Sequence, residues 1–400
     1  MNIPKIISTD NKITNLLKDI LNILLEHGAM FDAQLQIHYN ENGLSLHSVG
    51  IVNHLKRYLE IPTSLMPCID NYSFSIEGEK LLCKNRDEKD AIREKLMYLM
   101  VDIYNQTDKI PFQKVSSPFY NLKENREFLN LLLFPKKNNK KTEAYLKNID
   151  EEDYDKLLID TFLGTRIFNL KSTNGDLTIL MPMIDYFNHS FNAKGYQRVT
   201  ENDRDTLYVE SAPKENSSEL YVKYNNYDSL DTLLYYGFVD ATSPFLFSIE
   251  LTIALEDGRE IDVTTTKLSV KKELPKALAP LRAVLPVIMQ KDEKSVKVSR
   301  VAIPNKLYPA SLRKSIRVIL SAVNKEKELS EAQIKKQVIF IEKEIIKQNL
   351  QHYVTLQENL QPILEDNSVS DYIKEQLELL IKHNIKHIKN YGKWFTMRNS

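Results

Sequence analysis

Glycine is scarce in this chain, with only 10 glycines among 400 residues. A Rossmann-type dinucleotide site needs the glycine-rich turn G-x-G-x-x-G, and a phosphate loop needs the Walker pattern. Neither pattern occurs in the sequence, and the zinc-protease pattern H-E-x-x-H is missing as well. These absences argue against the glycine-lined route to a nucleotide cofactor, so a nucleotide-bearing ligand would need a different kind of site.

Cysteine is scarcer still, because Cys68 and Cys83 are the only two. Two thiols cannot build a tetrahedral thiolate zinc site or a disulfide framework. We therefore expect a reduced, intracellular protein without a metal centre, in which both thiols are buried as small hydrophobic side chains.

An excess of one charge is also lacking, since Lys plus Arg and Asp plus Glu each number 54. A balanced chain argues against bulk nucleic-acid binding, which needs a basic surface. One local exception is the stretch from Lys382 to Arg398, which carries Lys386, Lys389 and Lys393 and no acidic residue. We interpret this stretch first as the solvated face of a terminal helix and second as a docking patch.

Signals for export and for membrane insertion are missing too. The first residues show no basic segment followed by an apolar core, so no signal peptide is expected. The most apolar region, 233–255, is interrupted by Asp240, Pro244 and Glu250, which indicates soluble core. The expectation is a monomeric protein of the cytoplasm or nucleus, with no membrane partner.

The spacing of apolar residues changes along the chain, from helical to strand-like and back. Apolar residues at helical spacing predict an amphipathic helix over 13–25 and a mainly helical region from 84 to about 158. Short β-branched and aromatic runs predict strands, and the helical period returns from about residue 262. Many short strands without alternating helices argue against a doubly wound parallel sheet. The predicted strands are 44–47, 58–61, 177–180, 206–209, 220–224 and 245–251, and the later helices are 312–323, 334–350 and 369–388.

The segment from Leu180 to Ser190 is the most informative for chemistry. An apolar strand runs into Asp185 and then into Asn188 and His189. A strand that ends in a turn exposes polar side chains and backbone groups. A histidine at such a place is by itself more often structural than functional, so the neighbouring segments decide its meaning.

Four short blocks occur in order along the chain. They are Glu41-Asn-Gly-Leu-Ser-Leu46 with Leu59-Glu-Ile-Pro62, then Thr165-Arg-Ile-Phe168, then the segment 180–190, and last Tyr224 with Tyr236-Gly-Phe-Val-Asp240. In this order the blocks resemble the SET-domain protein methyltransferases, and most of all the branch typified by the Rubisco large-subunit lysine methyltransferase. The segment 353–360 resembles part of that branch's helical C-terminal substrate-binding domain, so the resemblance extends loosely over the whole chain.

The resemblance implies an α+β fold. Its core would be a SET domain of short β-sheets, which an inserted helical subdomain splits and an all-α C-terminal domain follows. The implied division is 1–84 for the N-terminal helix and the first part of the SET domain, and 85–158 for the inserted helical region. The second part of the SET domain, with the cofactor and catalytic motifs, would be 159–260, and the helical substrate-binding domain would be 261–400.

The resemblance also implies an activity, the transfer of a methyl group from S-adenosyl-L-methionine to a lysine amine on a folded protein substrate. Tyr236 would then be the catalytic residue. The implied cofactor-binding residues are Asn42, Gly43, Leu44, Arg166, Asn188, His189 and Tyr236. The implied channel for the substrate amine is lined by Phe168, Tyr196, Tyr224 and Phe245.

The residue types suit that chemistry. Methyl transfer from a sulfonium is an in-line displacement that needs a neutral amine, whereas a lysine side chain has an ordinary pKa of about 10.4. A narrow apolar channel and the neighbouring sulfonium both disfavour the ammonium form. Tyrosine hydroxyls and backbone carbonyls can orient the amine, and the Arg166 guanidinium can pair with the cofactor carboxylate. The reaction requires no metal.

Some positions keep a structural alternative. Tyr236 could be a core aromatic residue, and Arg166 could serve a structural ion pair. Asp185 is interpreted as a structural acceptor for backbone N–H groups. Asn42 and Ser45 depart from the family's cofactor loop, which often has an acid and a glycine at these positions.

Two other functions remain as alternatives. A sister group in the same branch methylates an actin histidine, but it has an asparagine where Phe168 stands and lacks the tyrosine at position 236, so both positions favour lysine here. A degenerate SET core that acts as an interaction scaffold is the other alternative. The Lys-, Asn- and Ile-rich composition, in a largely eukaryotic branch, also raises the hypothesis of a secreted effector directed at a host.

Overall fold

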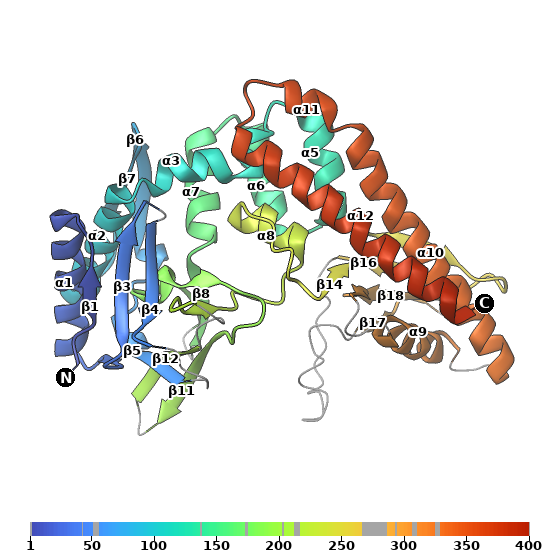
Figure 1. Cartoon of the computed structure of the whole chain (residues 1–400), viewed down its shortest axis with the longest axis horizontal. Helices are drawn as coiled ribbons and strands as arrows, with labels where there is room; N and C mark the ends of the chain where they lie inside the picture. The colour runs from blue at the N-terminus through green and yellow to red at the C-terminus, as the bar shows by residue number, and fades with distance from the viewer. Residues whose placement is uncertain are drawn as a thin grey trace. The chain divides into compact units, whose positions relative to one another are not determined.

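The computed structural model describes residues 2–41, 43–50, 56–136, 138–172, 175–201, 204–211, 217–265, 286–292, 294–305, 310–324 and 329–399. The chain divides into two compact units, each discontinuous in sequence. The first unit comprises 1–115 and 153–226, and the second comprises 116–152 and 227–400. Figure 1 labels their helices and strands. Among the described residues, no helix is both long and apolar enough to cross a bilayer.

The first unit opens on strand β1 (Lys5–Ile7) and helix α1 (Asn11–Glu26). The Asp10 carboxylate caps α1 by accepting hydrogen bonds from the N–H groups of Lys12 and Ile13. The leucines and isoleucines of α1 recur at helical spacing and are buried, and α1 packs against α2 (Ala91–Gln106). The amphipathic helix predicted over 13–25 is therefore confirmed.

Two small sheets carry most strands of the first unit. In one, β1 pairs in parallel with β3 (Leu35–Asn40), and β3 pairs antiparallel with β4 (Gly43–Ser48). The other has the order β11 (Tyr196–Glu201), β12 (Arg204–Ser211), β5 (Lys56–Pro62) and β2 (Met30–Phe31). Also in this unit are the hairpin of β6 (Tyr72–Glu77) with β7 (Lys80–Asn85), the hairpin of β8 (Ile167–Ser172) with β9 (Gly175–Leu180), and the parallel pair of β10 (Asn188–His189) with β13 (Tyr221–Val222).

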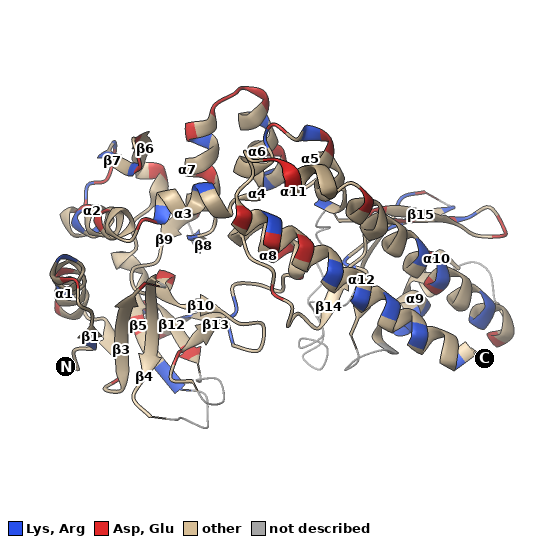
Figure 2. Ribbon diagram, turned by 45° about the horizontal axis from the view of Figure 1, so that its top comes forward, with Lys and Arg blue, Asp and Glu red and all other residues tan. Residues whose placement is uncertain are grey.

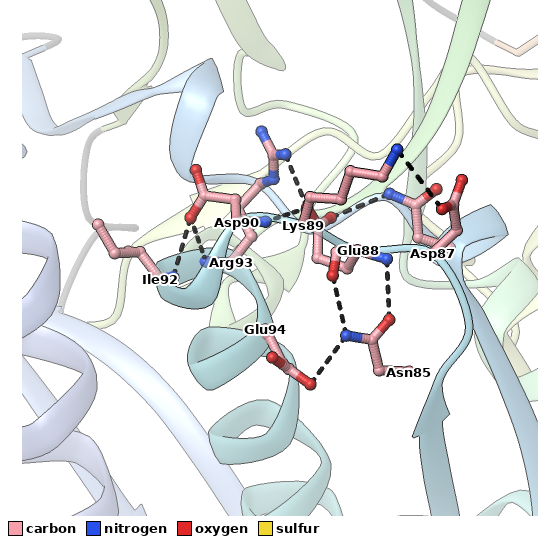
Figure 3. A network of polar contacts seen from close by, with 9 residues as sticks. Asn85, Asp87, Glu88, Lys89, Asp90, Ile92, Arg93 and Glu94 are labelled. Carbon is pink, nitrogen blue, oxygen red and sulfur yellow. Dashed lines mark hydrogen bonds and ion pairs between the residues drawn. The ribbon is translucent and has the colours of Figure 1, made fainter.

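Helix α2 begins in a polar network that directly follows β7 (Figure 3). The Asp90 side chain caps the helix by accepting two backbone N–H groups of its first turn. Glu88 is buried and pairs with the Arg93 guanidinium at 2.7 Å. Burial raises the pKa of the Glu88 carboxyl, but hydrogen bonds from Arg93 and Asn71 outweigh burial and hold the pKa below its ordinary value. An ionised carboxylate thus joins the end of β7 to the start of α2.

The second unit contains a four-stranded sheet with the order β15-β16-β18-β17, in which β16 and β18 run parallel. Two further strands, β14 and β19, pair antiparallel. Their bounds are β14 (Phe245–Phe247), β15 (Leu251–Ala254), β16 (Glu260–Thr264), β17 (Val287–Gln290), β18 (Ser295–Ser299) and β19 (Ala302–Pro304). The shorter helices are α4 (Pro118–Asn121), α5 (Arg126–Leu133), α6 (Lys140–Asp150), α8 (Ser229–Tyr236) and α11 (Gln361–Glu365).

Two long helices, α10 (Glu331–Glu358) and α12 (Asp371–Asn399), lie side by side in the second unit (Figure 1). Glu342 of α10 is fully buried, and its carboxylate accepts a hydrogen bond from the Tyr391 hydroxyl of α12 at 2.5 Å. The same carboxylate pairs with the guanidinium of Arg313 in α9 (Ala310–Val323) at 2.6 Å. One buried acid therefore links three helices.

The α+β fold class predicted from the sequence is confirmed. The helices predicted over 312–323, 334–350 and 369–388 correspond to α9, α10 and α12, each longer than predicted. Among the described residues after 262, however, the first helix begins at residue 310, because the strands β16 to β19 come first. The all-α description therefore holds for the described residues from 310 onward. The sequence 295–299 alternates serine and lysine with two buried valines, a strand pattern too short to stand out.

The boundaries of the two units differ from the predicted four-part division. The predicted inserted region, 85–158, is shared between the units, which separate at residue 116. Residues 227–260, predicted with the second part of the SET domain, belong to the second unit. The functional meaning of the four-part division stays a prediction.

Both cysteines differ from the expectation that they are buried. Cys68 and Cys83 are each partly exposed free thiols. Partial desolvation still raises the pKa of Cys83 to about 12, so the thiol stays protonated at neutral pH. Neither thiol forms a cluster with three or more possible metal ligands in the part of the chain that the structure describes.

Gly237 ends helix α8 in the left-handed conformation, with φ of 77°. A Cβ atom at this position would lie 2.5 Å from the Ser116 carbonyl oxygen, so Gly237→Ala should suffer both backbone strain and a clash. Gly258 is the matched control, because its φ is 82° and nothing lies within 4 Å of its Cβ position. We expect Gly258→Ala to lower the free energy of unfolding by about 1 kcal/mol and Gly237→Ala by roughly 2–3 kcal/mol more. Equal losses in denaturant titrations would contradict the close approach to Ser116.

Candidate functional site

A buried ion pair in the first unit joins two of the four sequence blocks. The Arg166 guanidinium donates from Nη1 to Asp185 Oδ2 at 2.8 Å, and the two side chains are only 17% and 6% exposed. The same Oδ2 accepts a hydrogen bond from the Tyr104 hydroxyl at 3.0 Å. The structural alternative for Arg166, that of an ion-pair partner, is therefore realised in part.

The pair does not use the Nε donor of Arg166. Its Nε is buried and has no hydrogen-bond acceptor among the described residues. The guanidinium carbon lies 5.1 Å from the ring centre of Tyr104 and 4.6 Å from that of Phe162, so aromatic faces hold it in place. Burial raises the pKa of Asp185 above its ordinary value, and the Arg166 charge opposes that rise. A buried donor without an acceptor is an uncommon feature that suits an anionic ligand.

The local chain conformation explains how the pair forms. Arg166 follows the C-terminus of α7 (Tyr154–Gly164) and directly precedes β8. Asp185 lies in the short 3-10 helix η4 (Ile184–Tyr186), which follows β9. Met183 enters η4 with φ of 64°, a left-handed conformation that is rare for a non-glycine residue. This sharp bend turns the end of the strand so that Asp185 faces Arg166.

The first sequence block lies beside the third. Strand β4 begins at Gly43 and packs against η4. Gly43 has φ of 92°, and Leu44 is buried and pairs with Tyr39 in the β3–β4 hairpin. Asn42, also predicted to bind the cofactor, lies outside the described residues. Ser45, which departs from the family pattern, forms a hydrogen bond with His47 through its hydroxyl group.

Lys109 is a candidate that sequence reasoning missed. It is the first residue of α3 (Lys109–Ser116), and its Nζ lies 3.4 Å from the position that a Cβ on Gly43 would take. Burial and, to a smaller extent, the Arg166 charge together lower the pKa of its ammonium to about 8, although the Asp185 charge opposes them. Two cations therefore share a single carboxylate beside Gly43. No local pattern marks Lys109, because these neighbours are distant in sequence.

His189 and Tyr224, both predicted site residues, are in contact. The Tyr224 backbone N–H donates to His189 Nδ1 at 3.1 Å, and the ring centres are 5.0 Å apart. Because an N–H group can only donate, Nδ1 accepts this hydrogen bond through its lone pair. The Tyr224 hydroxyl donates to the Phe187 carbonyl oxygen at 2.8 Å. The parallel pairing of β10 with β13 produces this arrangement.

The remaining predicted residues fall into three groups. Asn188 is exposed and donates to Glu219, a partner that sequence reasoning also missed, at 2.6 Å. Phe168 and Tyr196 meet edge to face, with ring centres 5.1 Å apart and planes at 85°. Tyr236 and Phe245 belong to the second unit. Tyr236 is partly exposed at the end of α8, and Phe245 is buried in β14.

Solved structures offer a comparison. The chain is similar to solved SET-domain structures. One, the SET domain of LSMT bound to lysine and AdoHcy, has a TM-score of 0.46 and 15% identity over 96% of this chain and 92% of that chain. Rubisco LSMT bound to AdoMet gives a TM-score of 0.41 at 15% identity, and Rubisco LSMT bound to sinefungin and monomethyllysine gives 0.43 at 16%, with the same coverage. No family model matches the sequence, and no curated protein matches it.

Within the first unit, three of the blocks contribute to one neighbourhood of Gly43, Lys109, Arg166 and Asp185. Its excess of positive charge can hold a carboxylate in a partly dehydrated place. The aromatic pair of Phe168 and Tyr196, in the same unit, offers an apolar surface with one hydroxyl group.

Proposed function

We propose that this chain is an S-adenosylmethionine-dependent methyltransferase whose acceptor is a lysine side chain of a protein. The observation that carries the proposal is the buried Arg166–Asp185 pair with an Arg166 Nε that has no acceptor among the described residues. It occurs where the sequence blocks predict the amino-acid end of the cofactor. A methyltransferase needs such a cation there because the cofactor ends in a carboxylate.

The residues present fit the cofactor's carboxylate. Arg166 Nε can donate to it, and the Lys109 ammonium supplies a second positive charge. The missing side chain at Gly43 lets a ligand approach the backbone at the start of β4. When bound, S-adenosylmethionine supplies a methyl group on a sulfonium that is open to displacement. The chain's task is then to orient an amine and exclude water from it.

The acceptor assignment rests on Phe168 and Tyr196. An apolar ring edge disfavours the charged ammonium of a lysine and so favours the neutral nucleophile. Phe168 offers no hydrogen-bond acceptor for an imidazole, which argues for lysine over histidine. Tyr236 is assigned as the catalytic residue on the Tyr-Gly-Phe-Val block of the sequence. Its hydroxyl would orient the amine.

The test begins with binding and ends with product analysis. S-adenosylmethionine should raise the melting temperature of the full chain, because a ligand that binds only the folded state stabilises it. Tritium from the cofactor's methyl group should then appear in protein of candidate lysates, and acid hydrolysis should yield methyllysine. Methylhistidine would establish the sister activity instead. Binding without transfer would favour the scaffold, and absence of binding would end the proposal.

Lys109→Met should weaken binding of the product S-adenosylhomocysteine by about tenfold at pH 7, because one charge-assisted contact is lost. The Lys109 pKa of about 8 adds a pH signature. The ammonium deprotonates as the pH rises past that value, so wild-type affinity should fall more steeply toward pH 9 than that of the variant. The cofactor's own amino group titrates equally in both proteins.

Isothermal titration calorimetry measures both effects. Lys95→Met is the matched control, because Lys95 is an exposed lysine on α2 of the same unit. It should leave affinity and its pH profile unchanged. Parallel profiles for Lys109→Met and the wild type would remove Lys109 from the cofactor site without affecting the role of Arg166.

A further inference from the structure

The C-terminal helices carry two rows of exposed lysines. Lys382, Lys386, Lys389 and Lys393 follow α12 at intervals of three and four residues, which places them on one face. Lys343 and Lys347 form a second row on α10. Figure 2 shows basic segments along both helices. Within the part of the chain that the structure describes, none of these six lysines is within ion-pair distance of a carboxylate.

A groove runs between the two rows. Its volume is about 760 Å³, and Lys343 and Lys347 line one side while Lys389 and Lys393 line the other. Its floor is apolar and includes Ile346, Leu350 and Ile388. We call these seven residues the lysine groove. A solvated helix face has no such floor, so the groove changes the first interpretation of this stretch.

A second groove flanks the α12 lysine row on its other side. It has a volume of about 720 Å³ and combines Lys382 and Lys386 with the apolar residues Ile381 and Ile385. The α12 lysines therefore stand as a charged ridge between two depressions with apolar walls. Residues 382–393 extend for about 17 Å along the helix axis, which is roughly three turns of a partner helix.

We propose that the lysine groove binds an acidic, amphipathic segment of another protein. Facing rows of ammonium groups attract carboxylates on both edges of the segment, and the floor accepts an apolar stripe between them. The two rows of lysines repel each other across the groove. Acidic groups of a partner relieve this repulsion, which favours their binding. The proposal does not depend on methyl transfer.

Other anionic partners fit the groove less well. A nucleic-acid backbone would pair with the lysines but would leave the apolar floor uncovered, and the whole chain has no net positive charge. A bilayer surface needs apolar side chains that project outward, whereas Ile346, Leu350 and Ile388 line a depression. An acidic amphipathic helix satisfies both the rows and the floor.

The probe is a labelled synthetic helix of about 18 residues with glutamates on one face and leucines on the other. Fluorescence anisotropy with the full chain should show saturable binding that weakens with added salt. A peptide of the same composition in scrambled order should bind at least about tenfold more weakly, because it presents no continuous apolar stripe.

Charge-reversal variants test whether lysines of the groove bind the peptide. Lys389→Glu with Lys393→Glu should weaken peptide binding by about tenfold or more. The control, Lys314→Glu with Lys335→Glu, makes the same change of net charge at exposed lysines of α9 and α10 outside the groove, and should leave binding within about twofold. The far-ultraviolet circular dichroism and the melting temperature should be unchanged in both variants, which shows that they fold.

Three results would overturn the proposal. One is peptide binding that the two double variants weaken equally. Another is tighter binding of a DNA duplex or of phosphatidylserine vesicles that requires Lys389 and Lys393, because it would assign the groove to a different partner. The last is absence of peptide binding to a chain whose circular dichroism and cooperative melting show that it is folded. None of these results bears on the proposed methyl transfer, so the two proposals fail separately.

Discussion

Arg166→Met should lower the free energy of unfolding by about 3–5 kcal/mol and weaken S-adenosylhomocysteine binding by about 100-fold or more. The loss of stability arises because Asp185 would stay buried without its cationic partner. The Tyr104 hydroxyl and the Lys109 charge, which forms no ion pair with Asp185, cannot fully balance a carboxylate that is 6% exposed. The loss of affinity arises because the ligand carboxylate would lose its buried guanidinium.

The stability of this variant should depend on pH in a defined direction. Burial already raises the pKa of Asp185 in the folded protein, and Arg166 opposes that rise. Without Arg166 the folded-state pKa lies further above the unfolded one, so the folded state binds more protons. Stability should therefore be greater at low pH and should fall as the pH rises through the folded-state pKa of Asp185. Denaturant titrations at several pH values measure this slope.

Two control variants separate the loss of stability from the loss of ligand affinity. Arg198→Met breaks the Arg198–Asp205 pair of the same unit, whose side chains are 37% and 23% exposed, and should cost less than about 1 kcal/mol. Arg166→Met combined with Asp185→Leu removes the lone buried acid and should recover part of the stability but no affinity. If Arg166→Met matched Arg198→Met in stability and bound S-adenosylhomocysteine normally, the buried pair and the cofactor assignment would both be wrong.

Local periodicity explains which elements the sequence could predict. The helix predicted over 13–25 and the later α9, α10 and α12 have apolar residues at helical spacing, and these residues are buried in the core. Strands β16 to β19 were missed because each is three to five residues long and gains its stability from pairing with distant segments. Residues 260–264 pair in parallel with 295–299, a contact that no short window can reveal.

Residues of the candidate site could likewise be predicted only where a local sequence pattern marks them. Arg166, His189 and Tyr224 were predicted as site residues because they stand in blocks with a recognisable order, and the structure brings Arg166 to Asp185 and His189 to Tyr224. Lys109, Tyr104 and Glu219 were missed because they belong to no block. Asp185 was interpreted as an acceptor for backbone N–H groups, whereas its partners are the side chains of Arg166 and Tyr104. A pattern of residue types in the sequence cannot distinguish a backbone partner from a side-chain partner.

Tyr236→Phe should lower the rate of methyl transfer by about 100-fold while S-adenosylhomocysteine binding stays within about twofold of wild type. The substitution keeps the aromatic ring and removes only the hydroxyl that is proposed to orient the amine. Tyr236 is partly exposed at the C-terminus of α8, and its ring centre lies 6.3 Å from that of Phe238 and 5.9 Å from that of Tyr227. The ring contacts should therefore keep the variant folded.

Tyr227→Phe is the matched control, because it removes a hydroxyl from the neighbouring ring outside the Tyr-Gly-Phe-Val block. It should leave the rate within about threefold, because it keeps the ring that lies beside Tyr236 and removes a hydroxyl that has no proposed role in orienting the amine. Single-turnover transfer of tritium from labelled cofactor compares the chemical step in the three proteins. Equal rates for Tyr236→Phe and Tyr227→Phe would withdraw the catalytic role from Tyr236. The Arg166 result would then decide alone whether the first unit binds the cofactor, because binding and transfer are measured separately.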